Sequence, residues 1–379
     1  IWCAASPSAR SSVSGTMANI KLELVDLRKE FGELIAVDDM SLACEEGETM
    51  ALLGPSGCGK STTLNMIVGL EAPTAGDILI DGKSVLATPP GQRNVGLVFQ
   101  DYAVFTHMNV RNNLEYGLRV RGMSRPDMER EVMKVASFLH LEHQLDSKPL
   151  ELGASELQRV AIGRTLVTNP EILLLDEPLS NLEAEMRNQM RRELRRIQAE
   201  TGQTIIYVTH DQIEALSLAH RIAVMDFGQL KQYDTAHNVY HYPDNTFVGS
   251  FLGNPPMNLV RGQFGHDGNR PVVAQNGSII PVPPSSAAGL SDGANVIVGM
   301  RPESMTLSEA DDPEAFIASV IAVEPQGPET VLTARIGETL LKLVVETGTQ
   351  ADEGSDIAIR PDAELLALFD AASGVRFKA

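Results

Sequence analysis

Short apolar runs alternate with stretches of helical periodicity through the first two thirds of the chain. The apolar runs, typical of buried strands, cover residues 50–53, 95–99, 172–175, 205–208 and 222–225. Residues 20–24 alternate between apolar and polar side chains, as a half-buried strand does. Helical spacing follows at residues 62–70, 124–139 and 182–200. This alternation predicts an α/β layered domain over residues 17–245, with a mainly helical part at about residues 101–168.

The pattern changes after residue 245. Pro, Gly and Asn now separate short strand-like runs, which cover residues 271–273, 279–280, 295–298, 316–323, 330–336, 339–345 and 356–359. These runs predict an all-β module over residues 246–379, most simply a small barrel.

A glycine-rich segment, the phosphate loop, connects the strand at residues 50–53 to the first helix. It matches the pattern G-x-x-x-x-G-K-[ST] and consists of Gly54, Pro55, Ser56, Gly57, Cys58, Gly59, Lys60, Ser61 and Thr62. Its glycines let backbone amides turn inward, and the following helix presents its N-terminus to an anion. Lys60 can then reach the β- and γ-phosphates of a nucleotide, and the Ser61 hydroxyl can bind Mg²⁺. An ordinary glycine turn is the alternative, which the flanking strand and helix disfavour.

Polar side chains follow two other buried strands. Asp176 and Glu177 end the run at residues 172–175, and His210 follows the run at residues 205–208. Beside a phosphate loop, Asp176 is well placed to hold Mg²⁺, and Glu177 can orient or deprotonate water. A solvated turn is the alternative for the acidic pair. Phe31, near the first strands, fits a hydrophobic plug by its residue type alone.

Composition narrows the choice of partners. The chain has 379 residues, with 31 basic and 50 acidic side chains and a formal charge of −19. This charge argues against a general nucleic-acid surface, which needs a basic face. Three cysteines form no disulfide framework and suit a reducing compartment. The sequence holds no run of eighteen apolar residues, so a membrane role would come through a partner.

The first residues do not follow the pattern of the rest. Residues 1–16 lack an initiating Met and are rich in Ser and Ala, and Met17 is a natural start. We expect these residues to be an unstructured leader left over from expression.

Together these motifs resemble the ATP-binding-cassette (ABC) family, and within it the ATPase subunits of bacterial sugar or polyol importers of the maltose-importer type. The resemblance extends over nearly the whole chain from residue 20. Its motifs are the Walker A loop at residues 54–62, the Q-loop around Gln100, Walker B at 172–178, the D-loop at 179–183 and the switch histidine, His210. Residues 251–258 and 299–303 resemble the C-terminal regulatory domain of that subfamily. The implied fold is a RecA-like P-loop NTPase core with a helical subdomain, followed by an all-β, OB-like (TOBE/MOP-like) domain.

The resemblance also implies roles for individual residues. Phe31 would stack on adenine, and Ser61, Gln100 and Asp176 would organise Mg²⁺ and water. Glu177 would act as the base, and His210 would fix the γ-phosphate. Two such subunits would sandwich two ATP molecules at the cytoplasmic face of the inner membrane. Closure of the pair would drive two permease subunits, which receive solute from an extracytoplasmic binding protein.

One motif departs from the family. Its signature sequence is Leu-Ser-Gly-Gly-Gln, and the corresponding segment here, the signature segment, is Leu152, Gly153, Ala154, Ser155 and Glu156. In the sandwich this segment approaches the γ-phosphate bound by the other subunit. Gly153 lacks the serine hydroxyl, and a Glu156 carboxylate about 4 Å from a phosphate charge would be opposed by roughly 4 kcal/mol at an effective dielectric constant near 20. A tolerated variant, in which Ser155 supplies the hydroxyl, is the alternative.

We therefore expect a heterodimer with an ATPase subunit whose signature is intact, while a homodimer stays an alternative. Two other functions stay open. One is a soluble cassette ATPase outside transport. Such a protein would be expected to have a coiled-coil insertion or a second cassette, and the sequence shows neither. The other is a regulatory protein that binds ATP with little turnover. The solute is not readable from the sequence, and glycerol, glycerol phosphate and oligosaccharides all fit.

Overall fold

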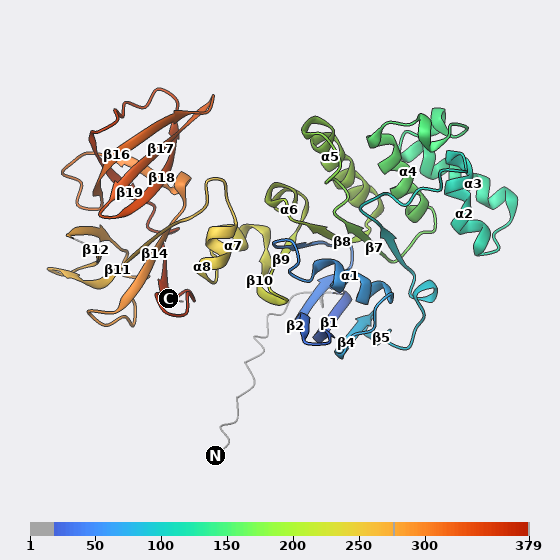
Figure 1. The fold of residues 1–379 in the computed structure, drawn as a ribbon, viewed down its shortest axis with the longest axis horizontal. Coiled ribbons are helices and arrows are strands. Elements are labelled where there is room, and N and C mark those ends of the chain that lie inside the picture. Colours follow the sequence, from blue (N-terminus) through green and yellow to red (C-terminus); the bar gives the residue numbers. More distant parts are fainter. Residues whose placement is uncertain (1–18, 276, 378–379) are drawn as a thin grey trace, which may run out of the picture.

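A computed structural model describes residues 19–275 and 277–377, so the leader expected at residues 1–16 lies outside the described part. Figure 1 shows an α/β body in blue and green, a β body in orange and red, and two short helices between them. These helices are α7 (Ala236–His241) and α8 (Thr246–Phe251). The predicted fold class, an α/β cassette followed by an all-β domain, is confirmed. Among the described helices none is long and apolar enough to cross a membrane.

The central sheet of the α/β body has the strand order β10-β9-β3-β8-β7-β6. Its strands are β3 (Thr49–Leu53), β6 (Val95–Val98), β7 (Ile172–Asp176), β8 (Thr204–Thr209), β9 (Arg221–Asp226) and β10 (Gln229–Thr235). All neighbours pair in parallel except β10, which runs antiparallel to β9. Separate apolar cores cover its two faces, which explains why these strands read as continuous apolar runs. The carboxyl ends of β3, β7, β8 and β9 therefore meet at one edge.

A second, antiparallel sheet has the order β2-β1-β4-β5. Its strands are β1 (Ile20–Phe31), β2 (Leu34–Glu45), β4 (Ala75–Ile80) and β5 (Lys83–Ser84). Its inner face shares a core with β3 and with α1 (Lys60–Val68). Leu22, Met40 and Met50 are fully buried in that core. The sheet thus covers the face of the central sheet on which α1 lies.

Helices cover the other side of the α/β body. They are α2 (Val110–Val120), α3 (Arg125–Phe138), α4 (Ala154–Leu166), α5 (Ala184–Thr201) and α6 (Gln212–Leu218), with 3₁₀ turns at Glu142–Gln144 and Pro149–Glu151. A further 3₁₀ turn, Pro90–Gln92, ends next to α1, since Arg93 donates to the carbonyl oxygens of Met66 and Ile67. Ser124 caps α3 as its sequence predicts, because its side chain accepts a hydrogen bond from the Asp127 amide. Helical spacing predicts Met186 on the apolar face of α5, but this side chain is 38% exposed, because the buried residues of α5 begin only at Met190.

The β body consists of two five-stranded antiparallel sheets, ordered β13-β12-β11-β14-β20 and β15-β19-β16-β17-β18. The strands of the first sheet are β11 (Asn258–Asp267), β12 (Arg270–Gln275), β13 (Ser278–Pro281), β14 (Asn295–Met300) and β20 (Ala367–Asp370). Those of the second are β15 (Met305–Ser308), β16 (Phe316–Pro325), β17 (Glu329–Ile336), β18 (Thr339–Glu346) and β19 (Asp356–Pro361). Both sheets contribute to one core, in which Phe264 and Leu332 are buried.

A fully buried arginine, Arg301, joins the β body to the two connecting helices. Its guanidinium donates to the carbonyl oxygens of Tyr240, at 3.1 Å from Nε, Gly249, at 3.1 Å, and Leu252. It also lies 4.2 Å from the centre of the Tyr240 ring, and the hydroxyl of that tyrosine donates to Glu303. Burial lowers the pKa of Arg301. This cluster, the arginine clasp, fixes one domain against the other.

Candidate functional site

The phosphate loop runs from the end of β3 to the start of α1, and its glycines are required by close packing. Gly59 has φ +104°, and a Cβ there would lie 2.3 Å from the Ala36 carbonyl oxygen. A Cβ on Gly54 would lie 2.3 Å from the Met225 carbonyl oxygen. The loop is therefore pressed against β2 and β9, and only glycine fits at these two positions. The helix that follows presents free amides at its N-terminus, which favours an anion.

Lys60 lies inside the loop, where it is 5% exposed. Its Nζ donates to the carbonyl oxygens of Gly54, at 2.8 Å, and Pro55, at 2.9 Å. Carbonyls are neutral acceptors, and a phosphate would make stronger, charge-assisted hydrogen bonds with the same ammonium group. The lysine is thus held at the place where a phosphate would replace its present partners.

Cys58 is also buried in this loop, at 3% exposed. Burial raises the pKa of its thiol, and the nearby Lys60 opposes this increase. The side chain is therefore a neutral thiol and adds no negative charge to the loop.

Ser61 and Asp176 meet as predicted. The Ser61 hydroxyl donates to the Asp176 carboxylate at 3.2 Å, although the two residues belong to α1 and to the end of β7. Burial raises the pKa of Asp176, while the hydrogen bond from Ser61 lowers it. A hydroxyl and a carboxylate are oxygen ligands of the type that Mg²⁺ takes, so this pair fits the metal.

Glu177 and His210 form a second pair at the same edge of the sheet. Nδ1 of His210 lies 3.1 Å from Oε2 of Glu177. Glu177 has φ +44°, an uncommon conformation for a residue with a side chain, and its amide donates to the Val208 carbonyl at 3.0 Å. Strained backbone of this kind is concentrated at functional sites. Here it places a half-buried carboxylate beside an exposed imidazole.

Gln100 and Phe31 are not part of these pairs. Nε2 of Gln100 donates to the Ser180 hydroxyl at 3.3 Å, and Asn181 donates to the Gln100 carbonyl at 3.1 Å. The Q-loop is thus tied to the D-loop, and the role of Gln100 at Mg²⁺ stays a prediction. Phe31 is the last residue of β1 and is 47% exposed, with the Lys29 ammonium 4.7 Å from its ring centre. Its stacking on adenine also stays a prediction.

Sequence patterning alone predicts solvated charge for the arginines of α5, because glutamates are interleaved with them (Arg187, Arg191, Arg192, Arg195 and Arg196). That prediction misses the role of Arg187. Arg187 donates to the Leu182 carbonyl in the D-loop at 3.2 Å and to Asp211 beside His210 at 3.3 Å. One guanidinium therefore connects the D-loop with the switch loop. Helical periodicity shows that this side chain lies off the apolar face, but not what lies opposite it.

Glu214, on α6, was missed as well. It is 3% exposed and accepts hydrogen bonds from the hydroxyls of Tyr207, at 2.8 Å, and Thr209, at 2.7 Å. Burial raises the pKa of Glu214, and the two hydroxyls oppose this increase. The carboxylate anchors α6 to the end of β8, from which His210 projects. An acidic residue on the buried side of α6, four positions after His210, was the available signal.

The signature segment forms the start of α4, with Gly153 as the N-cap residue and residues 154–156 in the first turn. Oε2 of Glu156 accepts from the Gly153 amide at 2.9 Å, and Oε1 accepts from Gln144 at 3.1 Å. The carboxylate therefore folds back onto its own helix N-terminus, in the manner of a capping box. The repulsion estimated from the sequence assumed a carboxylate facing the phosphate, so that estimate is too large for this geometry.

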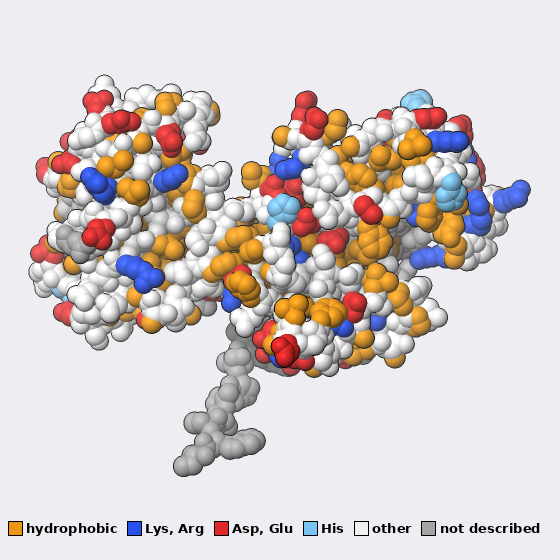
Figure 2. Space-filling model, in the orientation of Figure 1, with side chains coloured by type: hydrophobic (Ala, Val, Ile, Leu, Met, Phe, Trp, Pro, Cys, Tyr) orange, Lys and Arg blue, Asp and Glu red, His pale blue; other side chains and the backbone are white. Residues whose placement is uncertain are grey.

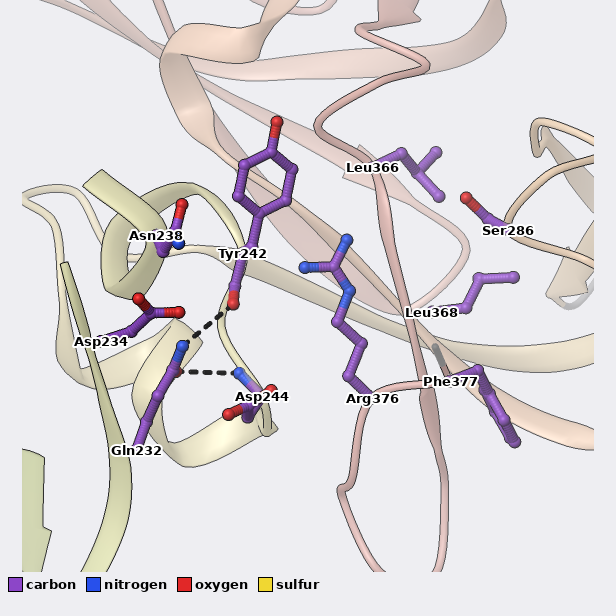
Figure 3. A pocket seen from close by; sticks show the side chains of 10 residues that line it. All are labelled: Gln232, Asp234, Asn238, Tyr242, Asp244, Ser286, Leu366, Leu368, Arg376 and Phe377. Atoms are coloured by element: carbon purple, nitrogen blue, oxygen red, sulfur yellow. Dashed lines mark hydrogen bonds between the residues drawn. The ribbon is translucent and has the colours of Figure 1, made fainter. Parts of the chain in front are cut away.

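A cavity of about 340 Å³ lies elsewhere, between the two domains (Figure 3). Its lining residues are Gln232 and Asp234 from β10, Asn238, Tyr242 and Asp244 from the segment of the connecting helices, and Ser286, Leu366, Leu368, Arg376 and Phe377 from the β body. Gln232 holds one wall, because its amide donates to the Tyr242 carbonyl at 3.1 Å and accepts from the Asp244 amide at 2.9 Å. The residues predicted to bind nucleotide do not line this cavity.

Comparison with known families gives two matches. Residues 37–180 match the family described as ABC transporter, and residues 253–305 match the family described as MalK OB fold domain. The first segment contains the phosphate loop, Gln100, the signature segment and Glu177. The second begins two residues after the end of α8 and contains Arg301 of the arginine clasp.

Several relatives match nearly the whole chain. It is 39% identical to the sulfoquinovosyl glycerol transport ATP-binding protein SmoE of Agrobacterium fabrum, over 94% of this chain and 99% of that protein. It is 41% identical to the sn-glycerol-3-phosphate import ATP-binding protein UgpC 3 of Rhizobium etli, over 87% and 91%. It is 40% identical to the maltose/maltodextrin import ATP-binding protein MalK of Escherichia coli K12, over 93% and 96%.

Solved structures resemble the α/β body. One is cbiO1 from Clostridium perfringens, part of the ABC transporter complex cbiONQ, with a TM-score of 0.55 and 27% identity over 58% of this chain and 90% of that chain. Another is a dimeric structure of a post-hydrolysis state of an ATP-binding cassette bound to ADP and Pi, with a TM-score of 0.51 and 29% identity over 57% and 98%.

Proposed function

Since the chain belongs to the ATP-binding-cassette transporter family, we propose that it is the ATP-hydrolysing subunit of an importer for a sugar, a polyol or a phosphorylated polyol. One observation supports the ATPase role above all. Lys60, the Ser61–Asp176 pair and the Glu177–His210 pair all lie at the same edge of the central sheet. The names of the relatives, which refer to sulfoquinovosyl glycerol, glycerol phosphate and maltose, support the class of solute.

In the proposed site the phosphates of ATP lie on the amides of the phosphate loop, and Lys60 turns from the loop carbonyls to the phosphate oxygens. Phe31, at the exposed end of β1, stacks on the base. Ser61 and Asp176 hold Mg²⁺, with Gln100 at the edge of this group. Mg²⁺ bound there supplies positive charge next to the phosphates.

Hydrolysis in this proposal depends on Glu177 and His210. The Glu177 carboxylate orients and deprotonates the attacking water, because it projects from the strand end that also carries Asp176. His210 contacts the γ-phosphate and the carboxylate together, since its ring already lies beside Oε2 of Glu177. Glu214 and Arg187 hold the loop that carries His210.

The signature segment supports an unequal pair of subunits, which we propose to lie at the cytoplasmic face of a membrane beside the permease subunits. Gly153 has no hydroxyl to donate to a phosphate on the second subunit, and Ala154 and Ser155 add side chains where the family has glycines. The Glu156 carboxylate folds back onto α4, which reduces its repulsion of the phosphate. It does not replace the missing hydroxyl or remove the added side chains. We therefore propose a partner ATPase with an intact signature, which would complete the ATP site of this chain. Two permease subunits would complete the transporter.

The experiment compares ATP hydrolysis by the purified chain and by a variant that carries Gly153→Ser, Ala154→Gly, Ser155→Gly and Glu156→Gln. A hydrogen bond to a charged group is worth about 1.5–3 kcal/mol, so restoring it should raise the rate about tenfold or more. The glutamine keeps the capping interaction, so α4 should stay folded. Lys60→Ala in the restored chain is the matched control and should abolish the gain.

Two other results would reject parts of this proposal. Full, cooperative hydrolysis by the unaltered chain would reject the need for a different partner. A restored chain that binds ATP without hydrolysing it would favour a regulatory ATP-binding protein instead. Co-purification with two permease subunits separates an importer subunit from a soluble cassette ATPase.

A further inference from the structure

The turn between β9 and β10 carries an unusual residue. Asp226 pairs with Gln229, so the hairpin has a two-residue loop, Phe227-Gly228. Both residues have positive φ, +44° for Phe227 and +78° for Gly228, which is the pattern of a type I′ turn. Such turns favour Asn-Gly or Asp-Gly, because positive φ at the first position strains a residue with a bulky side chain. Phenylalanine is therefore a costly choice here.

Packing does not explain this choice. The Phe227 side chain is 87% exposed, the highest value among the large hydrophobic residues that are described. An exposed ring in a strained turn neither fills a core nor relieves the backbone. The residue therefore needs an explanation outside the folded chain.

The turn lies beside the phosphate loop. β9 runs parallel to β3 with Val224 opposite Leu53, so the turn and the loop leave the sheet at the same edge. The Gly228 amide donates to the Cys58 carbonyl at 3.1 Å, and the Asp38 amide on β2 donates to the Gly228 carbonyl at 2.9 Å. The turn is thus fastened to the phosphate loop on one side and to β2 on the other.

Two exposed apolar residues lie at the start of β2, the strand to which the turn is fastened. Leu34 is 65% exposed and Ile35 is 40% exposed. The backbone of Ile35 touches the turn, because a Cβ built on Gly228 would lie 3.4 Å from its carbonyl oxygen. Figure 2 shows hydrophobic side chains gathered where Figure 1 places β2 and β10. We call Leu34, Ile35 and Phe227 the turn patch.

We propose that the turn patch is a docking surface for a second cassette ATPase subunit, which covers Phe227 when the two subunits close over ATP. The inference rests on the proposed function. A second subunit is the occupant that fits, because the patch is fastened to the phosphate loop and a solved relative of this cassette is dimeric with ADP and Pi bound.

The other side of such a pair is apolar as well. Leu150, two residues before the signature segment, is 84% exposed. In a head-to-tail pair the signature side of one subunit faces the phosphate-loop side of the other. A second subunit with the same surface would therefore bring an exposed leucine toward this edge, and apolar surfaces that close on each other exclude water.

The test uses the chain with the restored signature and Glu177→Gln, which can form a pair of identical subunits and keeps ATP uncleaved. Phe227→Asn is added, and light scattering after gel filtration measures dimer formation with ATP and Mg²⁺. Asparagine suits the type I′ turn, so the melting temperature of the nucleotide-free protein should rise by about 2–4 °C. Because the ring is no longer buried, the dimer should dissociate about ten times more readily or more.

Val120→Asn, on the surface of α2, is the matched control, because that side chain is 72% exposed and lies far along the chain from the turn. It should leave the dimer unchanged. ATP binding by the monomer, measured by titration calorimetry, should be the same with and without Phe227→Asn.

Three outcomes would overturn the inference. A dimer that forms equally well with asparagine means that the ring makes no contact with a second subunit. Weaker ATP binding by the monomer means that Phe227 contacts the nucleotide instead. A restored Glu177→Gln chain that binds ATP yet never dimerises removes the partner, whereas failure to bind ATP at all rejects the proposed function itself.

Discussion

The arginine clasp gives a prediction for Arg301→Met, which keeps the bulk of the side chain and removes its charge. Arg301 is fully buried and donates to three main-chain carbonyls of the connecting helices. Without the guanidinium these carbonyls lose their donor in the interior, at a cost of about 1 kcal/mol or more each. Removal of a desolvated charge offsets part of this cost. We expect a net loss of about 2–4 kcal/mol in the free energy of docking the β body.

The measurement is unfolding in urea, monitored with a separate probe in each domain, together with limited proteolysis. Loss of the clasp should separate two transitions and speed cleavage near residues 252–257, because the β body has its own core and can unfold alone. Arg335→Met, an exposed arginine of the same domain, is the control and should change stability by less than about 0.5 kcal/mol.

Arg301→Lys is the graded variant. Lysine keeps a positive charge but lacks the planar fork that reaches three carbonyls. Its loss of docking free energy should therefore lie between the values for the parent protein and for Arg301→Met. If Arg301→Met unfolds within about 0.5 kcal/mol of the parent protein, the carbonyls have found other donors and the reasoning is wrong.

Two further predictions concern residues that hold the switch loop. In the restored-signature chain, Arg187→Lys should lower kcat for ATP several-fold and leave KM unchanged, because Leu182 and Asp211 are bound by two different nitrogens of the planar guanidinium and lysine has only one nitrogen; an unchanged kcat, or a rise in KM alone, would contradict this role. Glu214 has a raised pKa in the folded protein, so its proton stabilises the fold at low pH, and this contribution is lost as the pH rises above about 4.5 and through the folded pKa. Glu214→Gln cannot ionise and should therefore gain stability relative to the parent from pH 5 to pH 8, measured as the difference in urea midpoints; a difference that does not change with pH would refute this assignment.

The parts of the site that the sequence predicts are those carried by one continuous segment. The phosphate loop follows from its own residue pattern, and Asp176 and His210 follow from their positions at the ends of apolar runs. Parallel strands bring such ends together whatever the intervening loops do, so the Ser61–Asp176 pair could be expected.

Contacts between segments far apart in sequence could not be predicted in this way. Arg187 reaches Asp211, 24 residues further along the chain, because α5 and α6 pack side by side. The direction of the Glu156 side chain depends on Gln144, which lies on a separate 3₁₀ turn. Residue type and spacing describe what a side chain offers, whereas its partner depends on packing that the sequence pattern does not specify.

The burial of the Cys58 thiol determines how fast oxidants and alkylating reagents can modify it. Thiols react with peroxide and with alkylating reagents as thiolates, and a raised pKa together with 3% exposure keeps this sulfur in its unreactive form. Electrophiles will therefore modify it only during local opening of the segment around Lys60. The rate at which a reagent such as iodoacetamide labels Cys58 would then report how often that segment opens. A bound nucleotide should lower this labelling rate.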